Sequence, residues 1–195
     1  MQVIDLIISP QPNLWNNAIT FIKTIDDSLK ENYLNINFDE FLSFPVVVDD
    51  DKIVCFSGLH LNERRWGKNL ARFSSRMWVH PGYRVKGMGK FTGGPRFLNS
   101  TYCLPVQYQK AKEFGLNSIF ISREHNRVGF EQYIDLIKIN CGLEFQIKPN
   151  RYNVCGGYFP DKEGCVQHVA VHHLTQTGQE TWIENMTKFL VVGDL

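Results

Sequence analysis

Long apolar runs are absent from this chain of 195 residues. Its longest uninterrupted stretches, such as FPVVV and FLVV, are far too short to cross a bilayer. The N-terminal stretch MQVIDLIISPQP has no basic region and carries Asp5 within its apolar part, unlike a secretory signal. The five cysteines are odd in number and contain no CxxC pair, which favours a reduced compartment. These absences predict a cytoplasmic protein without a membrane segment.

An excess of charge of either sign is also absent. The formal net charge is +1, so no overall field would draw the protein to nucleic acid or to an anionic membrane. Hydrophobic residues make up 43% of the chain, enough to fill a core and to argue against disorder. The sequence has no internal repeat, and its length suits one compact domain over residues 1–195.

Strands and helices are expected to alternate along the chain. The stretch FPVVVDDDKIVCFSGL has two β-rich runs joined by three aspartates, which predicts a hairpin with a polar turn. The stretch QYQKAKEFG predicts the end of a helix, with Gly115 as its C-cap. This order predicts a mixed sheet covered by helices, with a C-terminal strand and helix. The other expected strands are 2–9, 70–80, 117–122, 143–148 and 165–174, and the other helices are 14–33, 127–140 and 178–190.

The stretch HPGYRVKGMGKFTGG, residues 80–94, combines five glycines with several basic side chains. It follows a predicted strand and precedes a helix, where unpaired backbone N–H groups and the helix dipole attract anions. Glycine lets a phosphate approach the main chain directly. The pattern matches neither a P-loop nor a dinucleotide-binding fingerprint. The alternative interpretation is a flexible surface turn with solvated basic residues.

The spacing within this stretch resembles the coenzyme A pyrophosphate loop of the GNAT superfamily of N-acyltransferases, V-x-P-x-Y-R-x-x-G-x-G. A second resemblance lies downstream, where the family often places an asparagine, a small residue three positions on and a tyrosine seven positions on. The likeness covers residues 44–145 well. The matching residues are Val79, Pro81, Tyr83, Arg84, Gly87, Gly89, Asn126, Gly129 and Tyr133.

This resemblance implies an α/β (α+β) fold in which a twisted mixed sheet of six to seven strands is flanked by helices. It implies acetyl-CoA or a related thioester as co-substrate, with no metal, because backbone dipoles neutralise the diphosphate. An amine on a small molecule or a peptide would be the acceptor. The residues assigned to coenzyme A are Met77, Trp78, Val79, Arg84, Val85, Lys86, Gly87, Met88, Gly89, Lys90 and Asn126.

For catalysis, the resemblance implies that the hydroxyl of Tyr133 protonates the departing thiolate. A core tyrosine of an amphipathic helix is the alternative, and Asn126 could equally cap that helix. The strand LARFSSRMWVHP lacks the central glutamate that some family members carry. Glu124 and His125 are therefore the candidate bases, each acting through a water molecule.

The stretch FTGGPRFLNSTYCLP, residues 91–105, departs from the family pattern. A regular helix is not expected to pass unbroken through its glycines, Pro95 and Pro105. We expect an insertion here whose Arg96, Phe97 and Tyr102 shape the acceptor pocket, or else a degraded anion site.

Three functions stay open at this point. The first is an N-acyltransferase, and the second is a catalytically silent module that binds coenzyme A. The third is a nucleic-acid-binding protein that uses residues 80–90 and the segment NERRWGK, 62–68, with Trp66; the near-zero net charge disfavours it. His168 and His172 would lie too far apart along a strand to share a metal ion. The oligomeric state, monomer or homodimer, also stays open.

Overall fold

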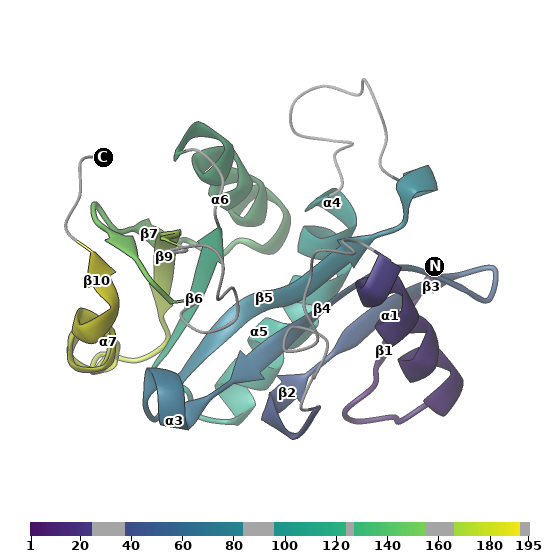
Figure 1. The fold of residues 1–195 in the computed structure, drawn as a ribbon, viewed down its shortest axis with the longest axis horizontal. Helices are drawn as coiled ribbons and strands as arrows, with labels where there is room; N and C mark the ends of the chain where they lie inside the picture. Colours follow the sequence, from purple (N-terminus) through teal and green to yellow (C-terminus); the bar gives the residue numbers. More distant parts are fainter. Residues whose placement is uncertain (25–37, 84–95, 124–126, 155–165, 192–195) are drawn as a thin grey trace. The chain divides into compact units, whose positions relative to one another are not determined.

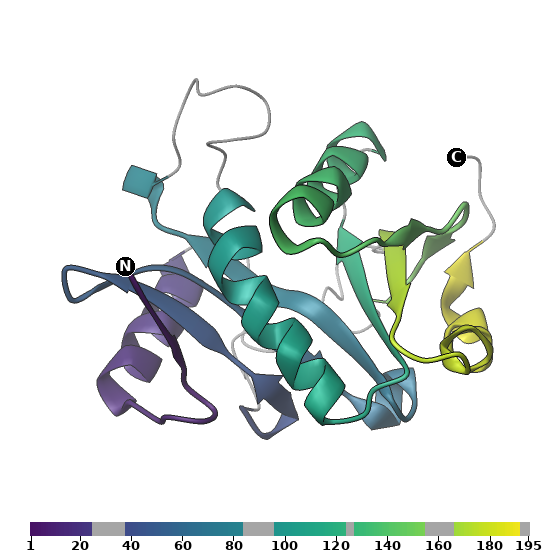
Figure 2. The ribbon, with the colours of Figure 1, turned by 180° about the vertical axis from the view of Figure 1, so that it is seen from behind.

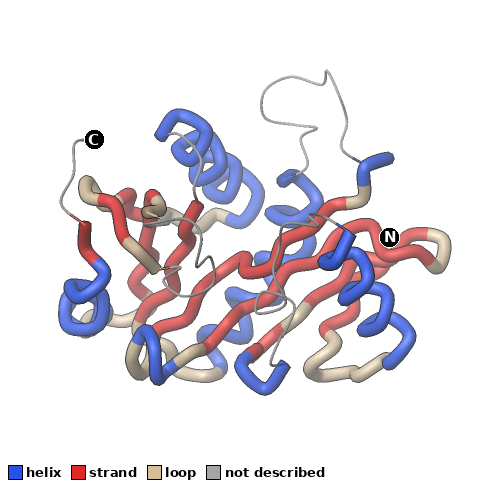
Figure 3. Tube along the Cα trace, in the orientation of Figure 1, coloured by secondary structure: helices blue, strands red, loops and turns tan. Residues whose placement is uncertain are grey.

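The computed structural model describes residues 1–24, 38–83, 96–123, 127–154 and 166–191 (Figure 1). The chain divides into two compact units, one with residues 1–60 and 73–110 and the other with residues 61–72 and 111–195. Strands and helices are mixed in both units, as the sequence predicts (Figure 3). No helix in the described ranges is long and apolar enough to cross a membrane. The expectation of one domain over residues 1–195 stays a prediction.

The first unit is built on a sheet with the strand order β1-β3-β4-β5. Strand β3 pairs antiparallel with both β1 and β4, and the short strand β2 also pairs antiparallel with β4. The predicted hairpin is confirmed: Asp50 and Asp51 turn the chain with φ of 46° and 60°, which aspartate tolerates. The strands are β1 (Gln2–Asp5), β2 (Phe41–Ser43), β3 (Pro45–Asp49), β4 (Lys52–Leu61) and β5 (Leu70–Val79).

Helices cover both faces of this sheet (Figures 1 and 2). Helix α1 (Pro12–Thr24) packs Phe21 against Trp78 of β5, with ring centroids 4.3 Å apart. Helix α5 (Leu104–Glu113) lies on the opposite face and ends before Gly115, whose φ of 65° confirms the predicted C-cap. The first strand is shorter than expected, and residues 25–33 of the expected first helix lie outside the described residues.

A helical run passes through Pro105, but it is not a regular helix. Helix α4 (Arg96–Leu98), a π-helical turn (Asn99–Cys103) and α5 follow one another without a break. In the π-helical turn the N–H of Leu104 donates to the carbonyl of Asn99, five residues back. This wider pattern accommodates Pro105 because proline cannot make the regular i−4 hydrogen bond. Residues 91–95 of the expected insertion lie outside the described residues.

The second unit contains the strand β6, which pairs antiparallel with β9 over six residues. Strand β7 pairs antiparallel with the other edge of β9, and the first three residues of β5 pair parallel with β6. The strands β8 and β10 form a separate antiparallel pair. The elements are α3 (Glu63–Trp66), β6 (Ser118–Arg123), α6 (Arg127–Cys141), β7 (Gln146–Ile147), β8 (Arg151–Tyr152), β9 (His168–His173), α7 (Gly178–Met186) and β10 (Leu190–Val191).

In helix α6, the spacing of apolar residues predicted most of the buried side chains, but not all of them. Tyr133, Ile134 and Ile137 are buried, as their helical spacing predicted. Helical spacing also predicts that Val128 lies on this inner face, but Val128 is 62% exposed. It lies in the first turn of the helix, and Phe130 is the buried residue near that end.

Asp5 fixes the turn that leaves β1. Its carboxylate accepts hydrogen bonds from the backbone N–H groups of Ile7 and Phe44, at 3.0 and 2.9 Å, and from the hydroxyl of Ser43 at 2.6 Å. Hydrogen bonds to a charged acceptor are worth about twice those to a neutral one. This single side chain therefore joins the first strand to the connection between β2 and β3.

We expect Asp5→Asn to destabilise the protein by about 1 kcal/mol, since the amide keeps the geometry but loses the charge. That change lowers the melting temperature by about 2–4 °C for a chain of this size. Thermal unfolding checks it against Asp135→Asn, an exposed aspartate of α6 that should melt within a degree of wild type. An equal loss in both variants would contradict the role given to Asp5.

Candidate functional site

The end of β5 carries the first three residues assigned to coenzyme A: Met77, Trp78 and Val79. Trp78 and Val79 are buried, and they belong to two different hydrophobic clusters of the first unit. The strand pairs with β4 on one edge, while its pairing with β6 on the other edge spans Leu70–Arg72. Trp78 and Val79 are thus anchored by their side chains. A ligand here would meet the backbone of β5.

The backbone of β5 is irregular just before these residues. Ser74 and Arg76 have φ values of 57° and 55°, in the left-handed region that residues other than glycine seldom adopt. Such outliers cost about 1–3 kcal/mol each and persist only where the surrounding structure holds them. Ser74 is held through its own backbone, because its N–H donates to the Oε1 atom of Gln107 at 2.9 Å.

Four fully buried polar side chains close into a ring around this point. The Nε2 atom of Gln107 donates to the Oγ atom of Ser57 at 2.7 Å, and the Ser57 hydroxyl donates to Asn99. The Nδ2 atom of Asn99 donates to the Oγ atom of Ser74 at 2.9 Å. All four residues have no exposed area. We call these four residues the polar ring. The polar ring joins β4, β5 and the helical run 96–113, so it fixes the irregular part of β5.

The start of the glycine stretch is tied to the hairpin. A 3-10 turn (Pro81–Tyr83) follows β5, and the Gly82 N–H donates to the Nδ1 atom of His80 at 3.0 Å. The hydroxyl of Tyr83 donates to the Oδ2 atom of Asp49 at 2.7 Å, and this hydrogen bond raises the pKa of Tyr83. The tyrosine of the resemblance therefore anchors the stem of the loop. The residues of the loop itself lie outside the described residues: Arg84, Val85, Lys86, Gly87, Met88, Gly89 and Lys90.

The second unit contributes Tyr133, the expected acid. It lies in α6 and is 1% exposed. The guanidinium of Arg123, at the end of β6, stands over its ring, with 5.1 Å between the Cζ atom and the centroid. A cation over an aromatic face is attracted by the ring quadrupole, so Arg123 fixes the orientation of the phenol. Glu124, His125 and Asn126 lie outside the described residues.

Some residues that support the candidate site were not identified from the sequence. The polar ring and Arg123 were not singled out, although serines within the apolar runs VCFSGL and RFSSRM were a visible signal. A serine at an inward-facing strand position needs a buried partner. The partner could not be found from the sequence, since Ser74 and Gln107 are 33 residues apart.

The segment 62–68 presents fewer groups that could bind nucleic acid than its sequence suggested. Residues Glu63–Trp66 form the short helix α3, and Trp66 is 1% exposed. Its ring packs edge-on against Phe120 at 5.2 Å, in the core of the second unit. Stacking on bases needs an accessible ring face, so Trp66 does not provide one.

Two of the described cysteines, Cys55 and Cys141, are poor nucleophiles. Cys55 and Cys103 are fully buried with their Sγ atoms 4.0 Å apart, and the contact with Cys103 together with burial raises the pKa of Cys55. Burial raises the pKa of Cys141 to about 12. The thiolate is the reactive form, so Cys55 and Cys141 do not suit covalent catalysis.

Known structures share this fold. A probable acetyltransferase from Staphylococcus epidermidis matches with a TM-score of 0.56 and 14% identity, over 89% of this chain and 99% of that one. An acetyltransferase from Bacillus subtilis in complex with CoA matches with a TM-score of 0.53 and 13% identity, over 89% and 99%. An IAA acetyltransferase from Bacillus cereus matches with a TM-score of 0.51 and 13% identity, over 89% and 99%. No protein-family model and no curated protein sequence matches the chain.

Proposed function

We propose that this chain, which has the fold of acetyltransferases, is an N-acyltransferase that moves an acetyl or other acyl group from coenzyme A to an amine. The observation that carries the proposal is the place of the glycine stretch. It follows directly on β5 and the 81–83 turn, and the next described residues begin the helical run 96–113. The GNAT-like spacing of Arg84, Gly87 and Gly89 falls within it. A cytoplasmic location goes with this proposal.

In the proposed reaction, the nitrogen of the acceptor attacks the carbonyl carbon of the thioester. The new C–N bond forms, the C–S bond breaks, and coenzyme A leaves as a thiolate that takes the proton of the Tyr133 hydroxyl. The amine loses one proton to Glu124 or His125 through a water molecule. Catalysis then rests on holding two reactants in line and on moving these protons.

The residues of β5 and the loop would hold the co-substrate in this proposal. The backbone of Met77, Trp78 and Val79 would bind the pantetheine arm, and the amides from Val85 to Lys90 would bind the diphosphate. The anchored stem supports this assignment, since Tyr83 and Asp49 hold the start of the loop without using its glycines. Backbone N–H groups at the start of a helix neutralise phosphate without a metal.

A silent module that binds coenzyme A is the second candidate. It is favoured by one feature, the absence of a carboxylate from β5 between Phe73 and Val79, where some GNAT enzymes carry a glutamate. Both candidates require coenzyme A binding. They differ only in whether an amine becomes acylated.

Acetyl-CoA should raise the melting temperature by about 5–10 °C at 100 times its dissociation constant. Ligand at that excess stabilises the native state by about 2.7 kcal/mol, and each kcal/mol is worth about 2–4 °C for this size of chain. Differential scanning fluorimetry measures the shift. A Gly89→Glu variant should lose it, because the carboxylate would lie where the diphosphate binds.

The matched control is Gln109→Glu, an equal change of charge at an exposed position of α5, which should keep the shift. No shift in wild type at millimolar acetyl-CoA would refute both candidates. Release of free thiol in the presence of a panel of amines then separates the enzyme from the silent module.

A further inference from the structure

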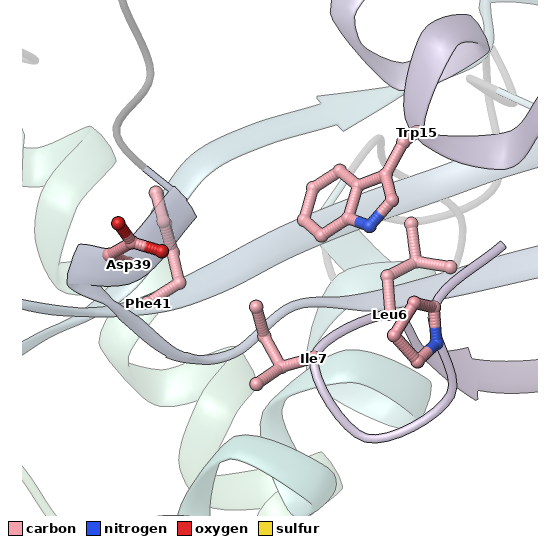
Figure 4. Close-up of a pocket in the computed structure, with 6 residues that line it drawn as sticks. Leu6, Ile7, Trp15, Asp39 and Phe41 are labelled. Carbon is pink, nitrogen blue, oxygen red and sulfur yellow. The ribbon is translucent and has the colours of Figure 1, made fainter. Parts of the chain in front are cut away.

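A pocket of about 440 Å³ lies in the first unit, apart from the residues assigned to coenzyme A (Figure 4). This volume is in the range of small-molecule sites, roughly 300–1,000 Å³. The turn after β1 forms one side of it, α1 a second, and the start of β2 a third. The residues that line it are Leu6, Ile7, Pro10, Trp15, Asp39 and Phe41.

Two of its walls are aromatic and held by the core. Trp15 packs against Phe44 with ring centroids 4.9 Å apart, and Phe41 meets the same ring edge-on at 5.2 Å. Phe41 also stacks on His60 at 4.8 Å. These contacts determine where the two rings stand, so a ligand would meet preformed surfaces. Preformed walls reduce the entropy lost on binding.

The third wall is equally fixed. Asp5 holds the turn after β1 through the backbone of Ile7, and the N–H of Leu6 donates to the carbonyl of Phe44 at 3.1 Å. The same Phe44 ring supports Trp15. The turn that carries Leu6 and Ile7 is thus tied to the connection between β2 and β3. Phe44 in this connection also supports the wall formed by Trp15.

Among the described residues that line the pocket, charge has one sign. Of the six lining residues, Asp39 alone is ionisable, and none is basic. Its carboxylate stands across the pocket from the indole of Trp15 (Figure 4). A carboxylate has about four acceptor sites, so it can bond a ligand besides the partners it has within the chain. A carboxylate and an aromatic face together favour a cation.

We propose that this pocket binds a primary ammonium ion attached to an aromatic or branched apolar body. The ammonium group donates hydrogen bonds to Asp39, and the apolar body fills the space between Trp15, Ile7 and Phe41. An anion of the same shape is repelled by Asp39. Binding of such an amine by the pocket does not depend on acyl transfer. That this amine is also the acceptor of the acyl group rests on the function proposed above.

Isothermal titration of the full chain with 2-phenylethylamine tests the proposal, without coenzyme A. Saturable binding is expected, and Asp39→Asn should weaken it about fivefold, the value of a partly solvated ion pair. Trp15→Leu should weaken it about tenfold, because the apolar body of the ligand loses the ring that it packs against. The control variant Asp135→Asn, exposed in α6, should bind as wild type.

Two control ligands sharpen the result. 2-Phenylacetate has the same ring and the opposite charge, and 2-phenylethanol has no charge; the acid should not bind and the alcohol should bind weakly. Because Trp15→Leu could disturb folding, the indole N–H resonance of Trp15 is followed in wild type as a second measurement. It should move with 2-phenylethylamine only. Equal binding of amine and acid, wild-type affinity in Asp39→Asn, or no binding would overturn the proposal.

The acyltransferase proposal and the amine-pocket proposal can be refuted independently of each other. An amine that binds while acetyl-CoA gives no thermal shift would support the pocket and remove the acyltransferase. A thermal shift with acetyl-CoA, accompanied by no binding of 2-phenylethylamine, would support coenzyme A binding and overturn the proposal for the pocket. If both ligands bind, Asp39→Asn should raise KM for the amine and leave KM for acetyl-CoA unchanged.

Discussion

Replacing Tyr133 with phenylalanine should slow thiol release from acetyl-CoA by about 100-fold, the lower end of what a positioned acid contributes. The hydroxyl would protonate coenzyme A as it departs, and phenylalanine has no proton to give. The ring itself stays, so its contact with Arg123 and its place in the core of the second unit are kept. KM for acetyl-CoA should therefore change little.

The measurement is kcat and KM for an amine that the panel shows to be acylated. Tyr152→Phe is the matched control, since Tyr152 is also buried in the second unit but lies in β8, outside the proposed machinery. It should keep wild-type kcat. Undiminished activity in Tyr133→Phe would show that the thiolate leaves without this proton, and Tyr133 would then be a core residue only.

Replacing Gln107 with leucine should lower the free energy of unfolding by about 3 kcal/mol. The substitution removes two buried hydrogen bonds of the polar ring: the Ser74 N–H loses its acceptor, and the Ser57 oxygen, whose hydroxyl still donates to Asn99, loses its donor. Each buried polar group that loses its hydrogen bond costs about 1–3 kcal/mol. Leucine has nearly the size of glutamine, so loss of packing contributes little. Urea unfolding measures the change.

Gln109→Leu is the control, the same substitution two residues on at an exposed position of α5. It should stay within about 0.5 kcal/mol of wild type, as surface changes do. Adding Ser57→Ala to Gln107→Leu should cost less than the two single changes together, because members of one hydrogen-bond network are not additive. Additive losses, or a loss in Gln107→Leu below 1 kcal/mol, would mean that the ring does not act as a unit.

Local patterns in the sequence were enough for most elements. The aspartates at 50 and 51 predicted the hairpin, because aspartate tolerates a positive φ. Gly115 predicted the end of α5, because glycine also adopts a positive φ readily. The period of the apolar residues identified α6. Each of these rules depends on neighbours in the chain, so no tertiary contact was needed to apply them.

Features that depend on tertiary contacts were not predictable. A regular helix through Pro105 was not expected, and the π-helical turn that accommodates this proline could not be predicted from the sequence. The polar ring joins residues from three stretches of the chain, and the pocket with Asp39 needs α1, β1 and β2 in place. For the site, the sequence supplied the co-substrate loop and Tyr133 as predictions, while the amine pocket came from the structure.

The wide turn at residues 99–103 bears on how this chain can gain or lose residues. A turn with i−5 hydrogen bonds holds more residues per revolution than a regular one. Removing a single residue there would let the turn close with regular i−4 hydrogen bonds, so the residues after it would keep nearly the same orientation. Removing one residue of α5 before Gln107 would instead rotate that side chain by about 100° about the helix axis and turn it away from β5. Insertions and deletions in this helix should therefore be compared by whether residue 107 still faces β5.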